Sequence, residues 1–149
     1  GRRSPFADQT LKGGIEGLTL ATTPAHLFKS LVEATAFGSR AIMEHLEKEG
    51  VTINQVIGVG GISLKSPYVM QALSDIMGVT IKVAATEQAG ALGAAMCAAV
   101  AGKVFTSLEG AQEALGQGNK TIYSPRVENK GTYDALYAKY IKLGKSQLS

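Results

Sequence analysis

The sequence predicts an α/β fold in which helices cover a mainly parallel sheet. Residues 56–59 and 80–84 are short apolar runs rich in β-branched side chains, as expected of strands. A long helical pattern over residues 24–50 precedes the first of these strands, and a helix follows each of them. This alternation is typical of a parallel sheet packed against helices. Because two strands make an incomplete sheet, we expect part of a larger lobe.

Composition excludes several classes of protein. The 149 residues are 45% hydrophobic and 18% charged, as expected of one globular domain. The net charge of +3 is not gathered into a basic stripe with aromatics, so no nucleic-acid partner is expected. The longest uncharged apolar run, residues 89–102, is too short to span a membrane. The single cysteine, Cys97, excludes a disulfide scaffold, indicates a reducing compartment such as the cytoplasm, and is expected to be a small buried hydrophobe.

The first fifty residues predict a loop and a long helix. Residues 1–17 have no periodicity, so they are expected to form a loop and a short edge strand, with Asp8 paired to Arg2 or Arg3. The sequence starts at Gly1 without an initiator methionine, which also leads us to expect a piece of a longer chain. Thr23 and Pro24 predict a helix start. His26 and His45 are expected to be solvated or to lie at the rim of this helix rather than to bind metal. Glu33 and Arg40 are expected on its solvated face, with a functional role as the alternative.

The stretch from Gln55 to Gly78 is predicted to form a strand, a glycine bend and a helix, and it contains the candidate binding site. A strand is followed by three glycines, Gly58, Gly60 and Gly61, that are expected to take positive φ, and then by a helix capped by Ser66 with Pro67 in its first turn. Such a bend points backbone N–H groups beyond the strand. Neither the dinucleotide fingerprint nor the P-loop pattern is present, so the bend fits either a plain tight turn or an anion-binding turn.

The remaining elements follow from caps and periodicity. Thr86 is expected to cap a helix whose small residues at steps of four pack closely on the sheet or contact a ligand. A capping box at residues 106–109 predicts a short helix to about Leu115, and residues 117–124 are expected to form a polar loop. The last helix, about residues 128–143, is predicted to dock through one stripe. The small residues are Gly90, Ala94, Ala98 and Gly102, and the docking stripe is Tyr133, Leu136, Tyr137 and Tyr140.

Together these residues resemble the C-terminal domain of the FGGY carbohydrate kinases along essentially the whole chain. Four further segments are most similar to the members that phosphorylate L-ribulose in L-arabinose breakdown: the opening nine residues, residues 31–43, Lys65-Ser66 and Glu87-Gln88. The motifs that carry the family resemblance are Gly1-Arg-Arg-Ser-Pro5 with Asp8, Gly13 and Gly17-Leu18-Thr19; Val59-Gly60-Gly61 with Ser66 and Gln71; Asp75-Ile76 with Gly78; and Glu87 with Ala91-Leu-Gly-Ala-Ala95.

The resemblance implies a ribonuclease-H-like, actin-like ATPase fold, with residues 1–149 as a partial C-terminal domain on the nucleotide side of a cleft. It implies that Gly60 and Gly61 lie against the adenosine end of ATP and that Lys65 lies beside the adenine. Mg²⁺, the pentulose and the N-terminal lobe of the same kinase are implied for the intact enzyme.

No residue of this chain matches the family's catalytic aspartate. Asp8 and Asp75 are assigned to structure, and the chain alone is expected to be inactive. The alternatives are another FGGY kinase, acting on xylulose or glycerol, and a non-catalytic interaction or regulatory module. An exposed strand edge and apolar face also predict self-association.

Overall fold

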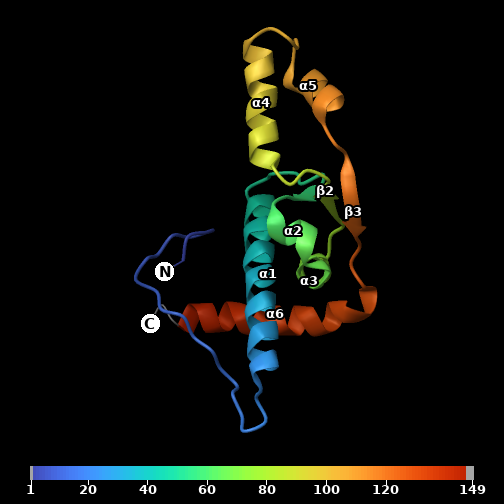
Figure 1. Ribbon diagram of the computed structural model, residues 1–149. Coiled ribbons are helices and arrows are strands. Elements are labelled where there is room, and N and C mark those ends of the chain that lie inside the picture. The colour runs from blue at the N-terminus through green and yellow to red at the C-terminus, as the bar shows by residue number, and fades with distance from the viewer. Residues whose placement is uncertain (1, 147–149) are drawn as a thin grey trace. The chain divides into compact units, whose positions relative to one another are not determined.

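The computed structural model describes residues 2–146, which form two compact units (Figure 1). One unit contains residues 2–54, 71–79 and 124–146, and the other contains residues 55–70 and 80–123. In chain order the elements are α1 (Pro24–Lys48), β1 (Val56–Gly58), α2 (Gly61–Lys65), α3 (Pro67–Met77), β2 (Ile81–Ala84), α4 (Ala89–Ala101), α5 (Leu108–Leu115), β3 (Asn119–Tyr123), the 3₁₀ turn η1 (Val127–Asn129) and α6 (Lys130–Ser146).

The first unit is built on α1, which begins where the sequence predicts. The Thr23 hydroxyl accepts a hydrogen bond from the His26 N–H at 3.3 Å, and His26 Nδ1 accepts from the Thr23 N–H at 3.3 Å. His26 therefore completes a reciprocal cap, which is a structural role at the rim of the helix. The helix ends at Lys48, shortly before Gly50 with φ +87°.

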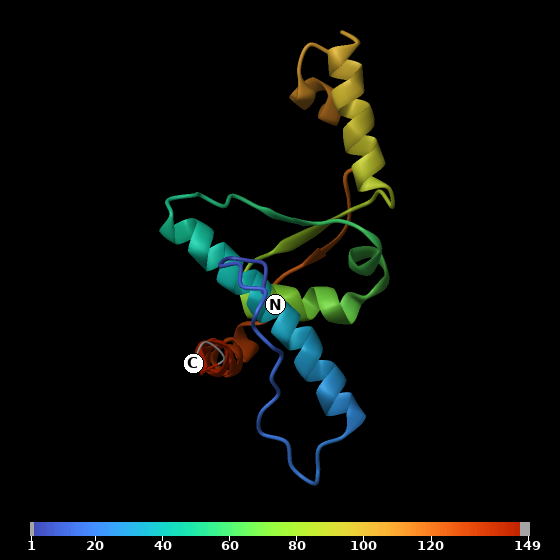
Figure 2. The same cartoon turned by 90° about the vertical axis from the view of Figure 1, so that its left-hand side faces the viewer.

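The core of this unit lies where α1 packs against α6 and the second half of α3. Phe37 of α1 is 5% exposed, and its ring lies 5.5 to 6.4 Å from three tyrosine rings of α6. Ala36 and Ile76 complete the buried cluster. Figure 1 shows α6 crossing α1, and Figure 2 shows α6 end-on beside α1. The predicted docking stripe is therefore confirmed: Tyr133, Leu136, Tyr137 and Tyr140 all pack against this core.

The second unit contains a three-stranded sheet of order β1-β2-β3. β1 and β2 are parallel, as predicted, with Val56 opposite Ile81, and β3 runs antiparallel to β2. Two expectations were wrong. Residues 117–124 do not form only a polar loop, because residues 119–123 pair with β2 as a strand. β2 was expected to be a partly exposed edge strand, yet it is the central one, with Ile81 2% and Val83 1% exposed.

One face of this sheet is open. Ile57, Lys82 and Ile122 lie opposite one another across the three strands. Ile57 is 47% exposed and Ile122 is 57% exposed, whereas the alternate residues of β2 are buried. Side chains alternate between the two faces of a sheet, so the open face and the buried face follow directly from this register.

Helices α4 and α5 lie side by side in both views (Figures 1 and 2). Among the residues of α4 only Met96 is buried. The small residues Gly90, Ala94, Ala98 and Gly102 are all exposed, so the expected close packing of this stripe on the sheet is wrong.

Three smaller expectations for this region were also wrong. Cys97 is exposed rather than buried. The helix begins at Ala89 instead of Thr86, whose hydroxyl instead accepts from the Gln88 N–H. Ser107, not Thr106, caps α5 by accepting from the Gly110 N–H at 3.2 Å. The two helices begin one to three residues later than predicted. Cys97 is exposed because the apolar pattern around it does not show which face of the helix is covered.

The opening segment forms a loop closed by one isolated bridge. The backbone groups of Arg2 and Asp8 exchange hydrogen bonds of 2.7 and 2.9 Å, while the Asp8 carboxylate accepts from the N–H and hydroxyl of Thr10. Arg2 and Asp8 thus meet through their backbones, and Asp8 has a local structural role. Gly1 lies outside the described residues. Within residues 2–146, no helix combines the length and apolar character needed to cross a bilayer.

Candidate functional site: the glycine bend after β1

The candidate nucleotide-contacting residues are the bend after β1 and the short helix α2. Gly60 has φ +89°, a conformation that favours glycine, and it directly precedes the first residue of α2, Gly61. The hydroxyl of Ser63, a buried residue, donates to the Gly60 carbonyl at 2.7 Å and so holds the bend in place. The prediction of a bend is confirmed. Of the three glycines expected at positive φ, however, only Gly60 adopts it.

Gly58 is needed for a different reason, which is close packing. A Cβ atom at this position would lie 2.8 Å from Met70 Cε, 3.3 Å from Ser63 Cβ and 3.6 Å from Ile81 Cγ2. The end of β1 therefore sits directly against α2, α3 and β2 of the same unit. A side chain larger than alanine would also meet Ser63 and Ile81 and would push the bend away from the sheet.

Gly61 and Lys65 face open space. Gly61 is exposed, and no atom lies within 4 Å of the place its Cβ would occupy. The first N–H groups of a helix have no partner within that helix, so the start of α2 presents backbone donors at an unobstructed surface. Lys65 ends α2, is exposed, and has no hydrogen bond or ion pair to any described residue. Gly60, Gly61 and Lys65 thus lie in one short segment that presents backbone donors and a lysine without a partner among residues 2–146.

The helix α3 that follows begins and ends as expected. The Ser66 hydroxyl accepts from the Val69 N–H at 3.4 Å, Pro67 is the first helical residue and Gly78 has φ +69° just beyond the last. The short helix α2 between the bend and Ser66 was not predicted. Its five residues carry no full turn of apolar periodicity that could have revealed it.

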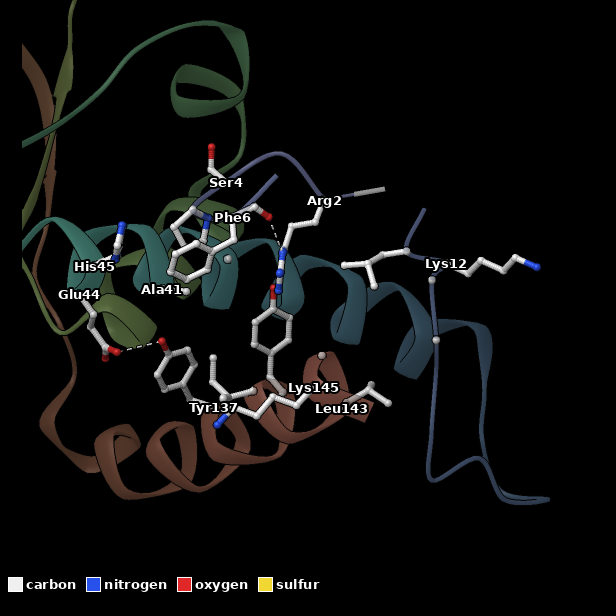
Figure 3. Close-up of a pocket in the computed structure, with 18 of the residues that line it drawn as sticks. Arg2, Ser4, Phe6, Lys12, Ala41, Glu44, His45, Tyr137, Leu143 and Lys145 are labelled. Atoms are coloured by element: carbon white, nitrogen blue, oxygen red, sulfur yellow. Dashed lines mark hydrogen bonds between the residues drawn. The ribbon is translucent and has the colours of Figure 1, made fainter. Parts of the chain in front are cut away.

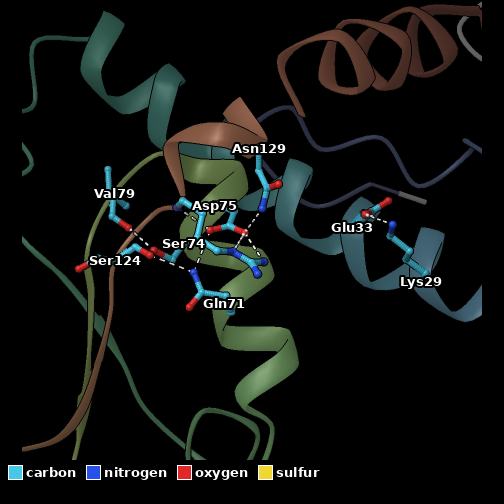
Figure 4. Close-up of polar contacts among 9 residues, drawn as sticks. Lys29, Glu33, Gln71, Ser74, Asp75, Val79, Ser124 and Asn129 are labelled. Carbon is cyan, nitrogen blue, oxygen red and sulfur yellow. Dashed lines mark hydrogen bonds and ion pairs between the residues drawn. The ribbon is translucent and has the colours of Figure 1, made fainter. Parts of the chain in front are cut away.

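In the first unit, Asp75 is the centre of a structural hydrogen-bond cluster (Figure 4). Its side chain is fully buried, and its two oxygens accept five hydrogen bonds of 2.6 to 2.9 Å from Gln71, Arg126 and Asn129. Burial raises the pKa of Asp75, but the hydrogen bonds from Arg126, Gln71 and Asn129 outweigh it and hold the pKa below its ordinary value. A carboxylate with every lone pair engaged is not available as a base. The assignment of Asp75 to structure follows from this geometry.

A second cluster in the same unit centres on Arg40, which was expected on a solvated face. Arg40 donates to Glu44 at 2.9 Å, to Asp134 at 2.8 Å and to the Ile76 carbonyl at 3.3 Å, and its guanidinium lies 4.3 Å from the centre of the Tyr137 ring. The expectation was wrong because Asp134 and Tyr137 come from α6, far along the chain. Burial, followed by the hydrogen bond to Glu44, raises the pKa of Tyr137 to about 12.

Glu33 also departs from the expected solvated position. It is 9% exposed, and its Oε1 atom has no hydrogen bond among the described residues, although Lys29 Nζ lies 3.7 Å away (Figure 4). His45 lies at the rim, as expected, with its ring 5.0 Å from that of Phe6. Within the described part of the chain no three His, Cys, Asp or Glu side chains gather in a group that could hold a metal ion.

Comparisons with known proteins place this geometry in a family. Residues 1–102 match the model of the FGGY family of carbohydrate kinases, C-terminal domain. The chain is 42% identical over 144 residues to the ribulokinase of Vibrio parahaemolyticus, which covers 97% of this chain and 25% of that protein. It is 40% identical over 147 residues to the ribulokinase of Bacillus licheniformis, which covers 96% of this chain and 27% of that protein. The chain therefore spans about a quarter of the length of these relatives.

Solved structures give the same fold. A ligand-bound xylulose kinase from Lactobacillus acidophilus matches 99% of this chain and 29% of its own, with a TM-score of 0.86 at 24% identity. A glycerol kinase from Plasmodium falciparum with ADP matches 93% of this chain and 27% of its own, with a TM-score of 0.74 at 24% identity. The fold is thus that of the actin-like ATPase class of sugar kinases, present here as part of a lobe. Within this class, the chain belongs to the FGGY family of carbohydrate kinases and represents its C-terminal domain.

Proposed function

We propose that this chain is the C-terminal, nucleotide-binding part of an ATP-dependent kinase that phosphorylates L-ribulose. The observation that carries the proposal is the 42% identity to a ribulokinase over 97% of this chain. The similarity is spread along the chain and is not confined to one motif. In this proposal residues 1–149 are one C-terminal kinase domain that works with an N-terminal lobe of the same protein, in the cytoplasm.

The glycine bend is the proposed nucleotide contact. Gly60 and Gly61 offer free backbone N–H groups and an open surface to the adenosine end of ATP, and Lys65 lies beside the adenine. Two features support this assignment: nothing lies within 4 Å of a Cβ at Gly61, and Lys65 has no partner among the described residues. ATP supplies the phosphoryl group, while the bend binds the adenosine end of ATP and so orients the nucleotide.

Catalysis itself is not assigned to residues of this chain. Asp75 is fully engaged, Asp8 is held by Thr10, and the described residues contain no group of ligands for Mg²⁺. We therefore propose that the base, the Mg²⁺-holding groups and the pentulose pocket belong to the rest of the kinase. The isolated chain should be inactive and, through the open edge of β1 and the exposed Ile57, should tend to self-associate.

A chimera tests the nucleotide assignment. The segment of the Vibrio parahaemolyticus ribulokinase that this chain matches is replaced by this chain, and ADP release is measured with L-ribulose. We expect activity that depends on L-ribulose. Gly61→Val should raise the KM for ATP by about tenfold or more because its side chain enters the proposed contact. Gly131→Val is the matched control, since Gly131 also lies in open space in the first turn of a helix.

The results separate the alternatives. A folded chimera without kinase activity would support a non-catalytic module, and an unchanged KM for ATP in Gly61→Val would remove the bend from the nucleotide site. The sugar is tested on the whole protein expressed from its natural gene. Preference for L-ribulose over D-xylulose and glycerol is expected, and preference for either of the others would assign the chain to a different FGGY kinase.

A further inference from the structure

The first unit contains a cavity of about 860 Å³ between the opening segment, α1 and α6 (Figure 3). This volume lies within the usual range for small-molecule sites. Gly60, Gly61 and Lys65 do not line it, so it is unrelated to the residues of the proposed nucleotide contact.

The charges around the cavity are strongly unbalanced. Arg2, Lys12, Lys48 and Lys145 line it together with His45, and the Lys12 amine points away from the other labelled residues in Figure 3. Glu44 is the single acidic residue in this lining, and both of its oxygens are already used, one by Arg40 Nε and one by the Tyr137 hydroxyl. No carboxylate among the described residues lies within ion-pair distance of Arg2, Lys48 or Lys145. Arg2 Nε also donates to the Phe6 carbonyl at 2.8 Å, so the remaining donors of Arg2 and the two lysines supply the positive charge of the cavity.

The walls of the cavity are aromatic and apolar. Phe6 lies over the ring of His45, and it is 60% exposed. Tyr140 stacks on Tyr137 with ring centres 6.3 Å apart, and its hydroxyl lies 3.5 Å from where a Cβ on Gly38 would be. The absence of a side chain at Gly38 keeps this part of the floor open. The lining of the cavity thus combines apolar and aromatic side chains with cationic ones.

We propose that this cavity binds a small organic phosphate. Arg2, Lys48 and Lys145 bind the phosphate group, and the carbon skeleton lies against Phe6 and Tyr140. A dianionic phosphate can bind several cationic side chains at once. An uncharged ligand would leave those cations unused, and an inorganic anion would leave the aromatic wall unused.

Phenyl phosphate is the probe, because it joins a dianion to an aromatic ring. Its affinity for the whole protein, expressed from its natural gene, is measured by calorimetry at low and at moderate salt. We expect a dissociation constant below about 1 mM, about tenfold tighter than for inorganic phosphate, and weaker at higher salt. Lys48→Gln and Lys145→Gln should each weaken binding by about threefold to tenfold. Lys139→Gln is the matched control, since Lys139 is an exposed lysine of α6 outside the cavity.

Several results would overturn the assignment. Absence of binding at about 10 mM phenyl phosphate would remove the site. An equal loss in Lys139→Gln and Lys145→Gln would show attraction to the general charge of the helix. Equal affinity for inorganic phosphate would exclude an organic ligand. Equal melting temperatures of the variants show that they fold, and Gly61→Val should keep full affinity for phenyl phosphate, so this site and the nucleotide site can fail independently.

Discussion

Arg126 binds the buried carboxylate of Asp75 with three hydrogen bonds. Its Nε and Nη2 atoms donate to Oδ2 at 2.9 and 2.6 Å, and its backbone N–H donates to Oδ1 at 2.9 Å. The two partners differ in exposure, since the Asp75 side chain is fully buried while that of Arg126 is 52% exposed. These hydrogen bonds join α3 to the segment that leads into α6, so Asp75 links two segments of the first unit that are distant in the sequence.

This asymmetry predicts unequal effects of removing each partner. Asp75→Ala should lower the free energy of unfolding by about 3 kcal/mol, because the donors of Gln71, Arg126 and Asn129 all lose the acceptor that joins them. Arg126→Ala should cost less, since its backbone N–H remains and its side chain is half in water. Urea unfolding of both variants measures the difference, with Glu128→Ala, an exposed neighbour, as the control. A larger loss for Arg126→Ala would contradict the central role of Asp75.

The same carboxylate predicts a pH dependence. The pKa of Asp75 is lower in the folded chain than in the unfolded one, so its contribution is complete above the unfolded pKa of about 4 and is lost as the pH falls through the lower folded pKa. The stability difference between wild type and Asp75→Asn should be constant between about pH 7 and 5 and should shrink below about pH 4. Other carboxylates titrate in both proteins and cancel. A difference that grows on acidification would disprove the assignment.

Much of the first unit could be predicted from the sequence because its helices follow local rules. Thr23 and Pro24 start α1, Gly78 follows α3, and the tyrosine stripe of α6 has helical spacing. Arg40 could not be placed, because Asp134 lies 94 residues further along the chain and no local pattern links the two. Only the tertiary fold brings these charges together.

The second unit was harder to predict. β3 has the sequence Asn-Lys-Thr-Ile-Tyr, which is largely polar and exposed, and its strand state comes from pairing with β2. The proposed site residues Gly60, Gly61 and Lys65 were predicted from the glycine bend and the family resemblance. The open surface around Gly61 and the close packing at Gly58 could not be predicted, because the sequence does not indicate which glycine contacts a neighbouring side chain.

Gly58 gives a graded prediction. Gly58→Ala should cost no more than about 1 kcal/mol, because the nearest atom, Met70 Cε, ends a flexible side chain that can move. Gly58→Val should cost about 1–3 kcal/mol, since the larger side chain also meets Ser63 and Ile81. Urea unfolding measures both, and Gly93→Ala, at an open helical position, is the control. Equal costs for alanine and valine would mean that packing is not the reason for this glycine.

Cys97 provides a test of the exposed face of α4. Because Cys97 is exposed in the folded chain, it should react completely with a bulky disulfide reagent without denaturant. The absorbance of the released thiolate gives the reacted fraction. Ala98→Cys in a Cys97→Ser background should react similarly, since Ala98 is also exposed, whereas Met96→Cys should be protected. If Cys97 stays unreactive in the native chain, the thiol is buried, as its sequence context suggests.

The central place of β2 sets the order in which the sheet opens. Its backbone is paired on both sides, to β1 and to β3, while each of those strands is paired on one side alone within the described residues. Exchange of backbone hydrogens with heavy water requires a bond to break, so the amides of Ile81 and Val83 should be replaced last. Fraying of β1 would release the bend at Gly60 while β2 and β3 stay joined, and the segment proposed to contact nucleotide could loosen without global unfolding.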